Sequence, residues 1–320
     1  MREPLFVKQN AEKWKNFESA PTNDPDELAD RFIQITDDLA YAKTFYPKSQ
    51  ITAYLNGLAA GLHQSIYKNK TEKGNRFFLF WKYELPLLFK TYHRQILYSF
   101  IFFIIFSLMG AMSAKYDENF VRLIMGDQYV DMTNANIAKG DPFGVYKQAG
   151  EFPMFIFIAA NNIYVAFVNF VCGIFLSVGS VYYLLRNSIM LGSFQYYFFS
   201  KGLGVQSILV IWIHGTLEML SFVIAAAAGL VLGNSLLFPR TYTRIESLKK
   251  GAKDGMKMTV GLVPIFLTAA FFESFVTRHT EMPVWLSSTI LVSSLTFMVW
   301  YVVIYPNLLS KKQKPYATQT

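Results

Sequence analysis

Residues 95–114 form an uninterrupted run of 20 residues without a charged side chain, bounded by Arg94 and Lys115. An α-helix rises about 1.5 Å per residue, so about 20 apolar residues cover the roughly 30 Å of hydrocarbon in a bilayer. The run therefore predicts a transmembrane helix. Hydrophobic residues make up 52% of the 320-residue chain and charged residues only 16%, whereas soluble proteins carry about 25% charged residues. This composition excludes an ordinary soluble globular protein and a disordered chain.

Further uncharged runs predict an all-α polytopic membrane protein with about six transmembrane helices in a domain at 95–310. After the first span at 95–114, the expected spans cover residues 163–185, 187–203, 205–234, 258–276 and 283–305. We place the second span after Asn161 and Asn162, because these two amides interrupt the apolar run that starts at residue 152.

The third predicted span is short. Its uncharged part, residues 187–200, would form a helix of only about 21 Å. It can cross a bilayer if Lys201 snorkels, if the bilayer thins locally, or if other helices bury it. Otherwise the piece is re-entrant and the chain has five crossings, so two alternatives stay open at this point.

The loops between the spans differ in charge. Residues 236–257 carry six Lys or Arg against two acidic residues, and the tail at 311–320 carries three lysines. Residues 115–151 carry four basic and six acidic residues. Because cytoplasmic loops are enriched in Lys and Arg, we expect 236–257 and both termini in the cytoplasm and 115–151 outside. The sequence thus predicts a multi-pass protein of the cytoplasmic membrane.

The net charge of the chain is +8, a value that is also found in nucleic-acid-binding proteins. Much of the excess positive charge lies beside apolar segments. We therefore expect membrane lipids, and no nucleic acid, as the partner of the basic residues.

Residues 1–94 predict a cytoplasmic helical domain. Three helices are expected: one near residues 8–18, one that starts at the Asp24 cap and ends at Pro47, and one at 49–69. The last part of the domain, residues 76–94, mixes aromatic and basic side chains. This mixture favours an amphipathic segment at the membrane interface; the alternative is a partly buried helix of a bundle.

Known catalytic signatures are missing from the sequence. Cys172 is the only cysteine, which excludes a disulfide scaffold and a zinc site made of thiolates. We find no nucleotide-binding loop, no HExxH and no GxSxG motif. The sequence therefore predicts a non-enzymatic protein.

Three ionisable side chains interrupt the apolar spans. His214 and Glu218 lie four residues apart, hence on one face of a helix, and Glu273 lies near the outer end of the fifth span. A charge inside a bilayer is costly and usually faces the protein interior, so we expect one intramembrane polar cluster. Its expected members are His214, Gly215, Glu218, Glu273, Asn161, Asn162 and Asn169. In this cluster Gly215 would let another backbone approach closely.

The polar cluster has three interpretations. It can hold the helices together through hydrogen bonds, or it can line a path for protons or ions. One histidine and two glutamates could also bind Zn²⁺. Nothing at ligand spacing supplies a fourth group, so we predict no metal and no cofactor.

Short motifs run along the chain. They are Asp38-Leu39-Ala40-Tyr41-Ala42, Tyr54-Leu55-Asn56, Asn161-Asn162, Gly173, Gly179, Asn187, Leu191-Gly192, His214-Gly215 with Glu218, and Glu273-Ser274-Phe275 with Thr277. In this combination the sequence resembles the stage II sporulation protein M family of polytopic membrane proteins over almost its whole length. The His-Gly-x-x-Glu segment is the most specific of these motifs.

One position departs from the family pattern. After Asn187 the family usually has a glycine, and this chain has Ser188. The substitution loosens the turn that we expect after the second span. That turn, at the cytoplasmic edge, would contain Arg186, Asn187 and Gly192.

The resemblance implies a membrane-embedded partner of peptidoglycan-remodelling enzymes. We therefore expect a non-enzymatic integral component of a cell-envelope assembly, with other envelope membrane proteins as partners and a possible homo-oligomer. The alternative is an ion- or proton-coupled transporter or channel that uses His214, Glu218 and Glu273. A third hypothesis, an intramembrane hydrolase, lacks a nucleophile or metal set beside His214.

Overall fold

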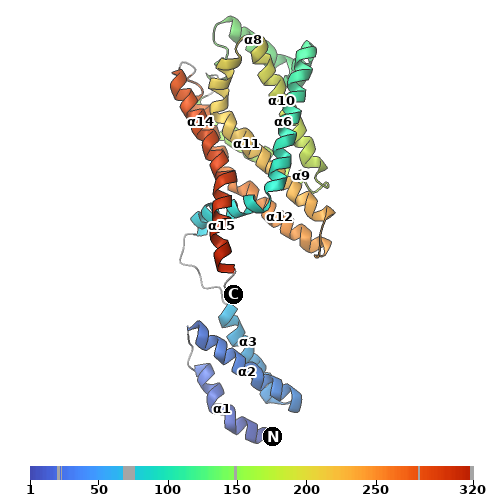
Figure 1. Cartoon of the computed structure of the whole chain (residues 1–320), viewed down its shortest axis with the longest axis vertical. Coiled ribbons are helices and arrows are strands. Elements are labelled where there is room, and N and C mark those ends of the chain that lie inside the picture. Colours follow the sequence, from blue (N-terminus) through green and yellow to red (C-terminus); the bar gives the residue numbers. More distant parts are fainter. Residues whose placement is uncertain (20–21, 23, 68–75, 148–149, 280–281, 318–320) are drawn as a thin grey trace. The chain divides into compact units, whose positions relative to one another are not determined.

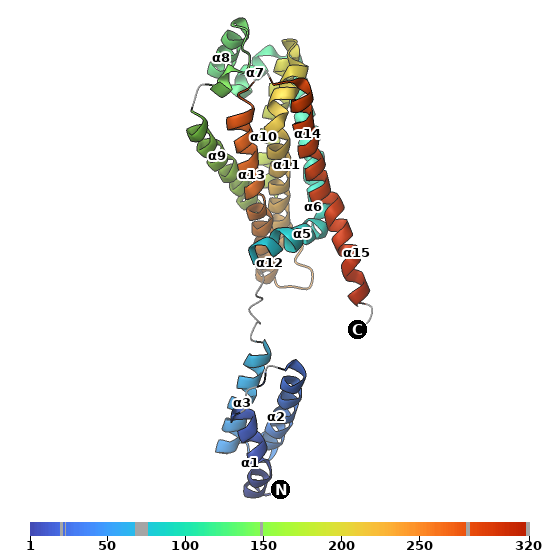
Figure 2. The same cartoon turned by 90° about the vertical axis from the view of Figure 1, so that its left-hand side faces the viewer.

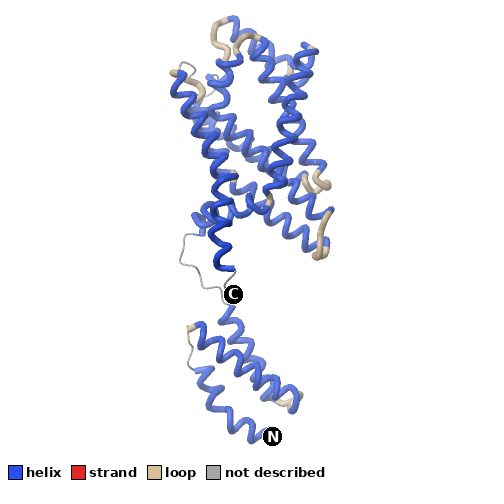
Figure 3. The backbone as a smooth tube through the Cα atoms, in the orientation of Figure 1, coloured by secondary structure: helices blue, strands red, loops and turns tan. Residues whose placement is uncertain are grey.

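The computed structural model describes residues 1–19, 22, 24–67, 76–147, 150–279 and 282–317, which form helices and loops without a strand (Figures 1 and 3). The all-α prediction is therefore confirmed. The chain divides into two compact units, Met1–Arg76 and Phe77–Thr320. This boundary differs from the one predicted after Arg94.

The first unit is a bundle of three helices, α1 (Glu3–Ser19), α2 (Pro25–Phe45) and α3 (Gln50–Tyr67). Its own hydrophobic core contains the buried side chains Phe6, Trp14, Ile35, Leu39, Ala42, Leu55, Ala59 and Leu62. The indole nitrogen of Trp14 donates to Asp38 at 2.7 Å. The Asp24 side chain caps α2 by accepting from the amide of Asp26, as the sequence predicted.

The second unit contains the membrane helices. They are α6 (His93–Tyr116), α9 (Glu151–Cys172), α10 (Val178–Ser200), α11 (Gly204–Leu237), α12 (Arg244–Gly261) continued by α13 (Val263–Phe271), and α14 (Val284–Val299) continued by α15 (Tyr305–Ala317). Five segments are long and apolar enough to cross a membrane. They are His93–Tyr116, Glu151–Cys172, Gly204–Leu237, Arg244–Val276 and Val284–Lys311.

The break between the second and third long helices was predicted at the wrong place. The structure has α9 and α10, separated at residues 173–177, where the sequence predicted helices at 163–185 and 187–203. Leu176 and Ser177 adopt left-handed φ angles of 52° and 70° at this turn. The uncharged run continues through the turn, so hydropathy gives no sign of it.

Helix α10 packs along α6 in a parallel arrangement (Figure 1). With 23 residues it is about 34 Å long, but it is not among the five segments that are long and apolar enough to cross a membrane, so the predicted crossing of this segment stays a prediction. At Gly110 and at Gly192 an added Cβ would overlap the backbone of the facing helix. Gly192 therefore serves close helix packing in the interior of α10, and it does not form the predicted turn.

The two ends of the second unit carry different folded elements (Figure 2). At one end, α7 (Glu118–Met125), α8 (Asp127–Ala138) and the turn Gly144–Lys147 form what we call the cap. The cap buries Phe143 and Tyr146 against the end of α10. The predicted external loop is therefore a folded helical element.

At the opposite end, α5 (Leu85–Thr91) docks on α12 and α15 and is preceded by α4 (Arg76–Leu79) and a π-helical turn (Phe80–Glu84). Leu85 and Phe89 are buried in the main core, which explains why this segment belongs to the second unit. Pro86 has no N–H for the carbonyl of Lys82, and the hydroxyl of Tyr305 donates to that carbonyl at 2.9 Å.

Most of residues 76–94 follow the second of the two alternatives predicted for them. Residues 80–92 are the partly buried helix of a bundle: Trp81 Nε1 donates to the carbonyl of Gly261 at 3.0 Å. The hydroxyl of Tyr92 donates to Asp254 at 2.6 Å, and burial, helped by this carboxylate, raises the pKa of Tyr92. Phe77 and Phe78 are exposed, and their place at a membrane interface stays a prediction.

Candidate functional site

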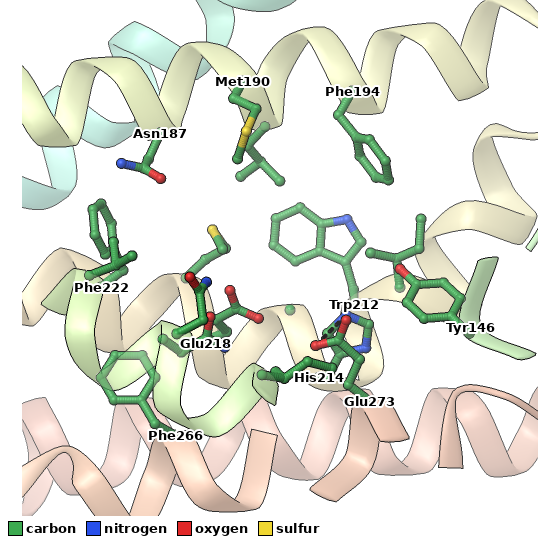
Figure 4. Close-up of a pocket in the computed structure, with 18 of the residues that line it drawn as sticks. Tyr146, Asn187, Met190, Phe194, Trp212, His214, Glu218, Phe222, Phe266 and Glu273 are labelled. Atoms are coloured by element: carbon green, nitrogen blue, oxygen red, sulfur yellow. Dashed lines mark ion pairs between the residues drawn. The ribbon is translucent and has the colours of Figure 1, made fainter. Parts of the chain in front are cut away.

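A cavity of about 450 Å³ lies beneath the cap, between α9, α10, α11 and the π-helical turn Phe272–Val276 (Figure 4). It brings together most of the polar residues singled out in the sequence. These are Asn161, Asn162, Asn187, His214, Gly215, Glu218 and Glu273. The other walls are mostly apolar and aromatic, with Met190, Phe194 and Phe222 among the lining side chains.

His214 is held from two sides by the segment that follows α13. Its Nδ1 lies 3.0 Å from the hydroxyl of Thr277, at hydrogen-bond distance. Its Nε2 lies 3.8 Å from Glu273 Oε2 (Figure 4). Tyr146 of the cap covers the ring edge-on, with centroids 5.8 Å apart. The imidazole is therefore buried in a fixed orientation with Nε2 toward a carboxylate.

Glu218 lies one helical turn after His214 in α11, as the spacing predicted. One nitrogen or oxygen atom from each of His214, Glu218 and Glu273 lies within 4.8 Å of the other two. Two carboxylates in such an enclosed place repel one another unless a proton or a cation compensates their charge. Among the described residues that line the cavity, none is a lysine or an arginine.

The asparagines of α9 separate into two groups. Asn161 and Asn162 lie inside α9, so they do not end the helix as the sequence suggested. Their amides line the cavity. The side-chain nitrogen of Asn162 lacks a hydrogen bond of good geometry among the described residues, although the residue is only 9% exposed. Asn169 is fully buried but does not line the cavity, so its predicted place in the cluster is corrected.

Two other predicted roles also change. A Cβ added at Gly215 would meet no atom within 4 Å, and Gly215 lines the cavity. It therefore faces space and not a neighbouring backbone. Arg186 lies exposed in the interior of α10, and Asn187 beside it lines the cavity. Neither residue forms the edge or the turn that the sequence suggested.

Several residues of the cavity wall escaped the sequence analysis. Tyr129 and Tyr146 come from the cap, and Trp212 from α11. Burial raises the pKa of Tyr129 to about 12 and that of Tyr146 well above its usual value, so both hydroxyls stay protonated. Trp212 Nε1 donates to Gln195 at 2.8 Å. Only the tertiary fold brings Tyr129 and Tyr146 to His214, so no local motif could have predicted these two.

The fold and the cavity define a polytopic helical membrane protein with a buried histidine–glutamate centre. Residues 99–278 match the family model described as Stage II sporulation protein M. The match covers more than half of the chain and includes every residue that lines the cavity. The chain therefore belongs to the stage II sporulation protein M family.

The first unit matches a different family model. Residues 4–68 match a domain of unknown function (DUF8413), which agrees closely with the extent of α1 to α3. No curated protein and no solved structure matches the chain.

Proposed function

We propose that this protein is a non-enzymatic membrane component of a cell-envelope assembly, and that it serves as a scaffold or partner of envelope-remodelling proteins. The observation that carries the proposal is the cap, a folded element that the membrane helices hold at one end of the bundle. Membership of the stage II sporulation protein M family supports the same function.

The cap combines an ordered frame with exposed apolar side chains. Arg122 pairs with Asp127 at 3.0 Å and with Asp131 at 2.7 Å, which ties α7 to α8. Leu123, next to Arg122, is 79% exposed. An exposed leucine on an ordered, charged surface fits the contact area of a partner protein.

The first unit offers a second surface. Its hydrophobic core is made by its own three helices. On its surface, Leu5, Ile33 and Phe45 are at least half-exposed. A further protein that covers these side chains would remove apolar surface from water. A chain with a separate helical unit and a cap can recruit partners through two surfaces.

Site-specific photo-crosslinking in cells tests the proposal. A photoreactive residue replaces Leu123 in the cap, Ile33 in the first unit, or Val292, an exposed residue of the membrane helix α14. We expect defined protein adducts with envelope components at positions 123 and 33, and lipid adducts at the control position 292. Absence of protein adducts at both 123 and 33 in abundant, folded protein would contradict the scaffold proposal.

We also propose that the end opposite the cap faces the cytoplasm. The described residues of α12 and its preceding loop at this end include Arg240, Arg244, Lys249, Lys250, Lys253 and Lys257, in agreement with the positive-inside rule. In a Cys172→Ser background, Thr241→Cys should be protected from an impermeant thiol reagent in intact cells, and Lys139→Cys in the cap should react. The reverse labelling pattern would invert the orientation.

A further inference from the structure

The three ionisable side chains in the cavity wall converge on one point. We propose that His214, Glu218 and Glu273 bind a divalent transition-metal ion, with Zn²⁺ or Mn²⁺ as the matching chemistry. The site goes beyond the scaffold function, because its three ligands come from α11 and the turn Phe272–Val276 and not from the cap or the first unit.

The distances fit a shared ion better than direct hydrogen bonds. His214 Nε2 and Glu273 Oε2 are 3.8 Å apart, beyond the roughly 3.2 Å limit of a good N–H···O bond. Two ligands on one tetrahedral ion, with bonds of about 2.1 Å, lie about 3.4 Å apart. All three ligand atoms lie within 4.8 Å of one another, so small side-chain rotations bring them to a common ion.

The histidine is oriented as metal-bound histidines are. Such histidines usually donate their second ring N–H to a fixed oxygen, which sets the tautomer and the ring plane. Here Thr277 Oγ1 lies 3.0 Å from Nδ1 and fills that role. The lone pair of Nε2 is then free to bind a metal ion, and Nε2 lies on the side of the ring that faces Glu273.

The charges also match. A neutral imidazole and two carboxylates carry a charge of −2, which a divalent cation neutralises. Unpaired charge inside a membrane protein is costly, and no described lysine or arginine lines the cavity. A metal ion therefore compensates two carboxylates that no described cationic side chain of the wall can pair with.

The sequence offers no fourth metal ligand, but the structure leaves space where a water can take that position. The three side chains face a cavity with room for water on the open side of an ion. Asn162 also lines it and is nine-tenths buried; within the described part of the chain its amide nitrogen lacks a hydrogen bond of good geometry but lies close enough to interact with Glu218. Its amide can contact a metal-bound water or a ligating carboxylate.

The ligand set selects the class of ion. Imidazole with carboxylates suits Zn²⁺, Mn²⁺ and Fe²⁺, whereas Ca²⁺ and Mg²⁺ prefer sites made of oxygen alone. The lack of a thiolate argues against Cu⁺.

Metal stoichiometry tests the proposal. The full chain, purified in detergent with a tag free of histidine, is stripped with a chelator, exposed to Zn²⁺ or Mn²⁺, desalted and analysed by mass spectrometry. We expect about one ion per chain. His214→Asn, Glu218→Gln and Glu273→Gln should each weaken binding at least tenfold. The controls His279→Asn and Glu151→Gln should bind as the unchanged protein does.

Two further measurements keep the test independent of variant folding. Co²⁺ added to the unchanged protein should give visible absorption bands of a four- or five-coordinate site. Thr277→Val, which keeps all three ligands, should weaken Zn²⁺ binding about 10–100-fold. The proposal is overturned if the folded, unchanged protein binds neither Zn²⁺ nor Mn²⁺, or if folded His214→Asn keeps full stoichiometry.

Discussion

The two halves of α11 are both largely apolar but differ in surroundings. In the half nearer the cap, His214, Gly215 and Glu218 border a cavity. In the other half, Gly229 and Gly233 touch the backbone or side chains around the α9–α10 turn so closely that a Cβ would overlap them. One helix thus has a half that holds the polar centre at a cavity and a half in which two glycines pack tightly against the neighbouring helices.

The difference shows that a glycine in a membrane helix does not by itself predict close packing against a neighbouring helix. Gly215 and Gly229 stand in apolar sequence on the same helix, and sequence alone assigned close backbone contact to Gly215. A Cβ at Gly215 meets no atom within 4 Å, whereas one at Gly229 would meet Ser180 and Asn169. What matters is the neighbour across the interface, and the neighbour is set by the tertiary fold.

The largest expected effect is on stability, and it comes from replacing Gly229 by alanine, with Gly215 as the control. Gly229→Ala forces a methyl group against α9 and α10 and should destabilise the protein by about 2 kcal/mol, lowering its melting temperature by roughly 4–8 °C. The matched Gly215→Ala fills empty space and favours the helix, so it should cause no loss. Thermal unfolding in detergent measures both; equal destabilisation would remove the distinction between the two halves.

A second prediction concerns Glu218 in the half that borders the cavity. In chelator-containing buffer, Glu218→Gln keeps the shape and two hydrogen-bonding ends, whereas Glu218→Ala leaves neighbouring polar groups unpaired, at a cost of about 1–3 kcal/mol. We therefore expect the Gln variant to be the more stable and more abundant of the two, as measured by fluorescence-detected size exclusion.

The same residue also separates the scaffold from a transporter. If the protein is a scaffold, Glu218→Gln and His214→Asn should keep the crosslinks at positions 123 and 33. Complete loss of envelope function in both variants, with normal abundance and intact crosslinks, would overturn the scaffold account.

The smallest predicted effect lies at the α9–α10 turn, beside the half with the tightly packed glycines. Leu176 has a left-handed φ of 52°, which costs an L-residue about 1–2 kcal/mol. Leu176→Gly removes that strain but adds chain entropy, so we expect a gain below about 1 kcal/mol. Ile174→Gly, at a neighbouring residue without a positive φ, should only destabilise. A drop in melting temperature for Leu176→Gly equal to that for Ile174→Gly would show that the turn is unstrained.

Sequence alone predicted the ionisable side chains of the site and the amides Asn161 and Asn162. His214 and Glu218 share a face of α11 because they are four residues apart, and Glu273 joins them as the third ionisable group in an apolar span. Tyr146 and Asn187 were not predicted as lining residues, because only the cap and the course of α10 bring them to the cavity. No sequence periodicity or motif spacing predicts that these two residues lie beside His214 and Glu218.

The helix boundaries show the same limit. Ile174, Phe175 and Leu176 form the α9–α10 turn and are exposed on the unit, as apolar residues facing lipid can be. They therefore look like helix interior in a hydropathy count, and Asn161 and Asn162 look like a break although they lie within α9. Leu85 and Phe89, in turn, suit a membrane interface and a protein core equally well, and the fold buries them.

The central claim is that Gly215 of α11 borders the polar cavity, whereas Ser221, three residues beyond Glu218, is fully buried. Cysteine accessibility in membranes tests it most directly. In a Cys172→Ser background, Gly215→Cys should react with a small, neutral methanethiosulfonate, because a side chain there projects into space. Ser221→Cys, at a fully buried residue of the same helix, should stay unmodified. Equal reactivity of the two cysteines, or a Gly215→Cys that does not react in folded protein, would contradict the account.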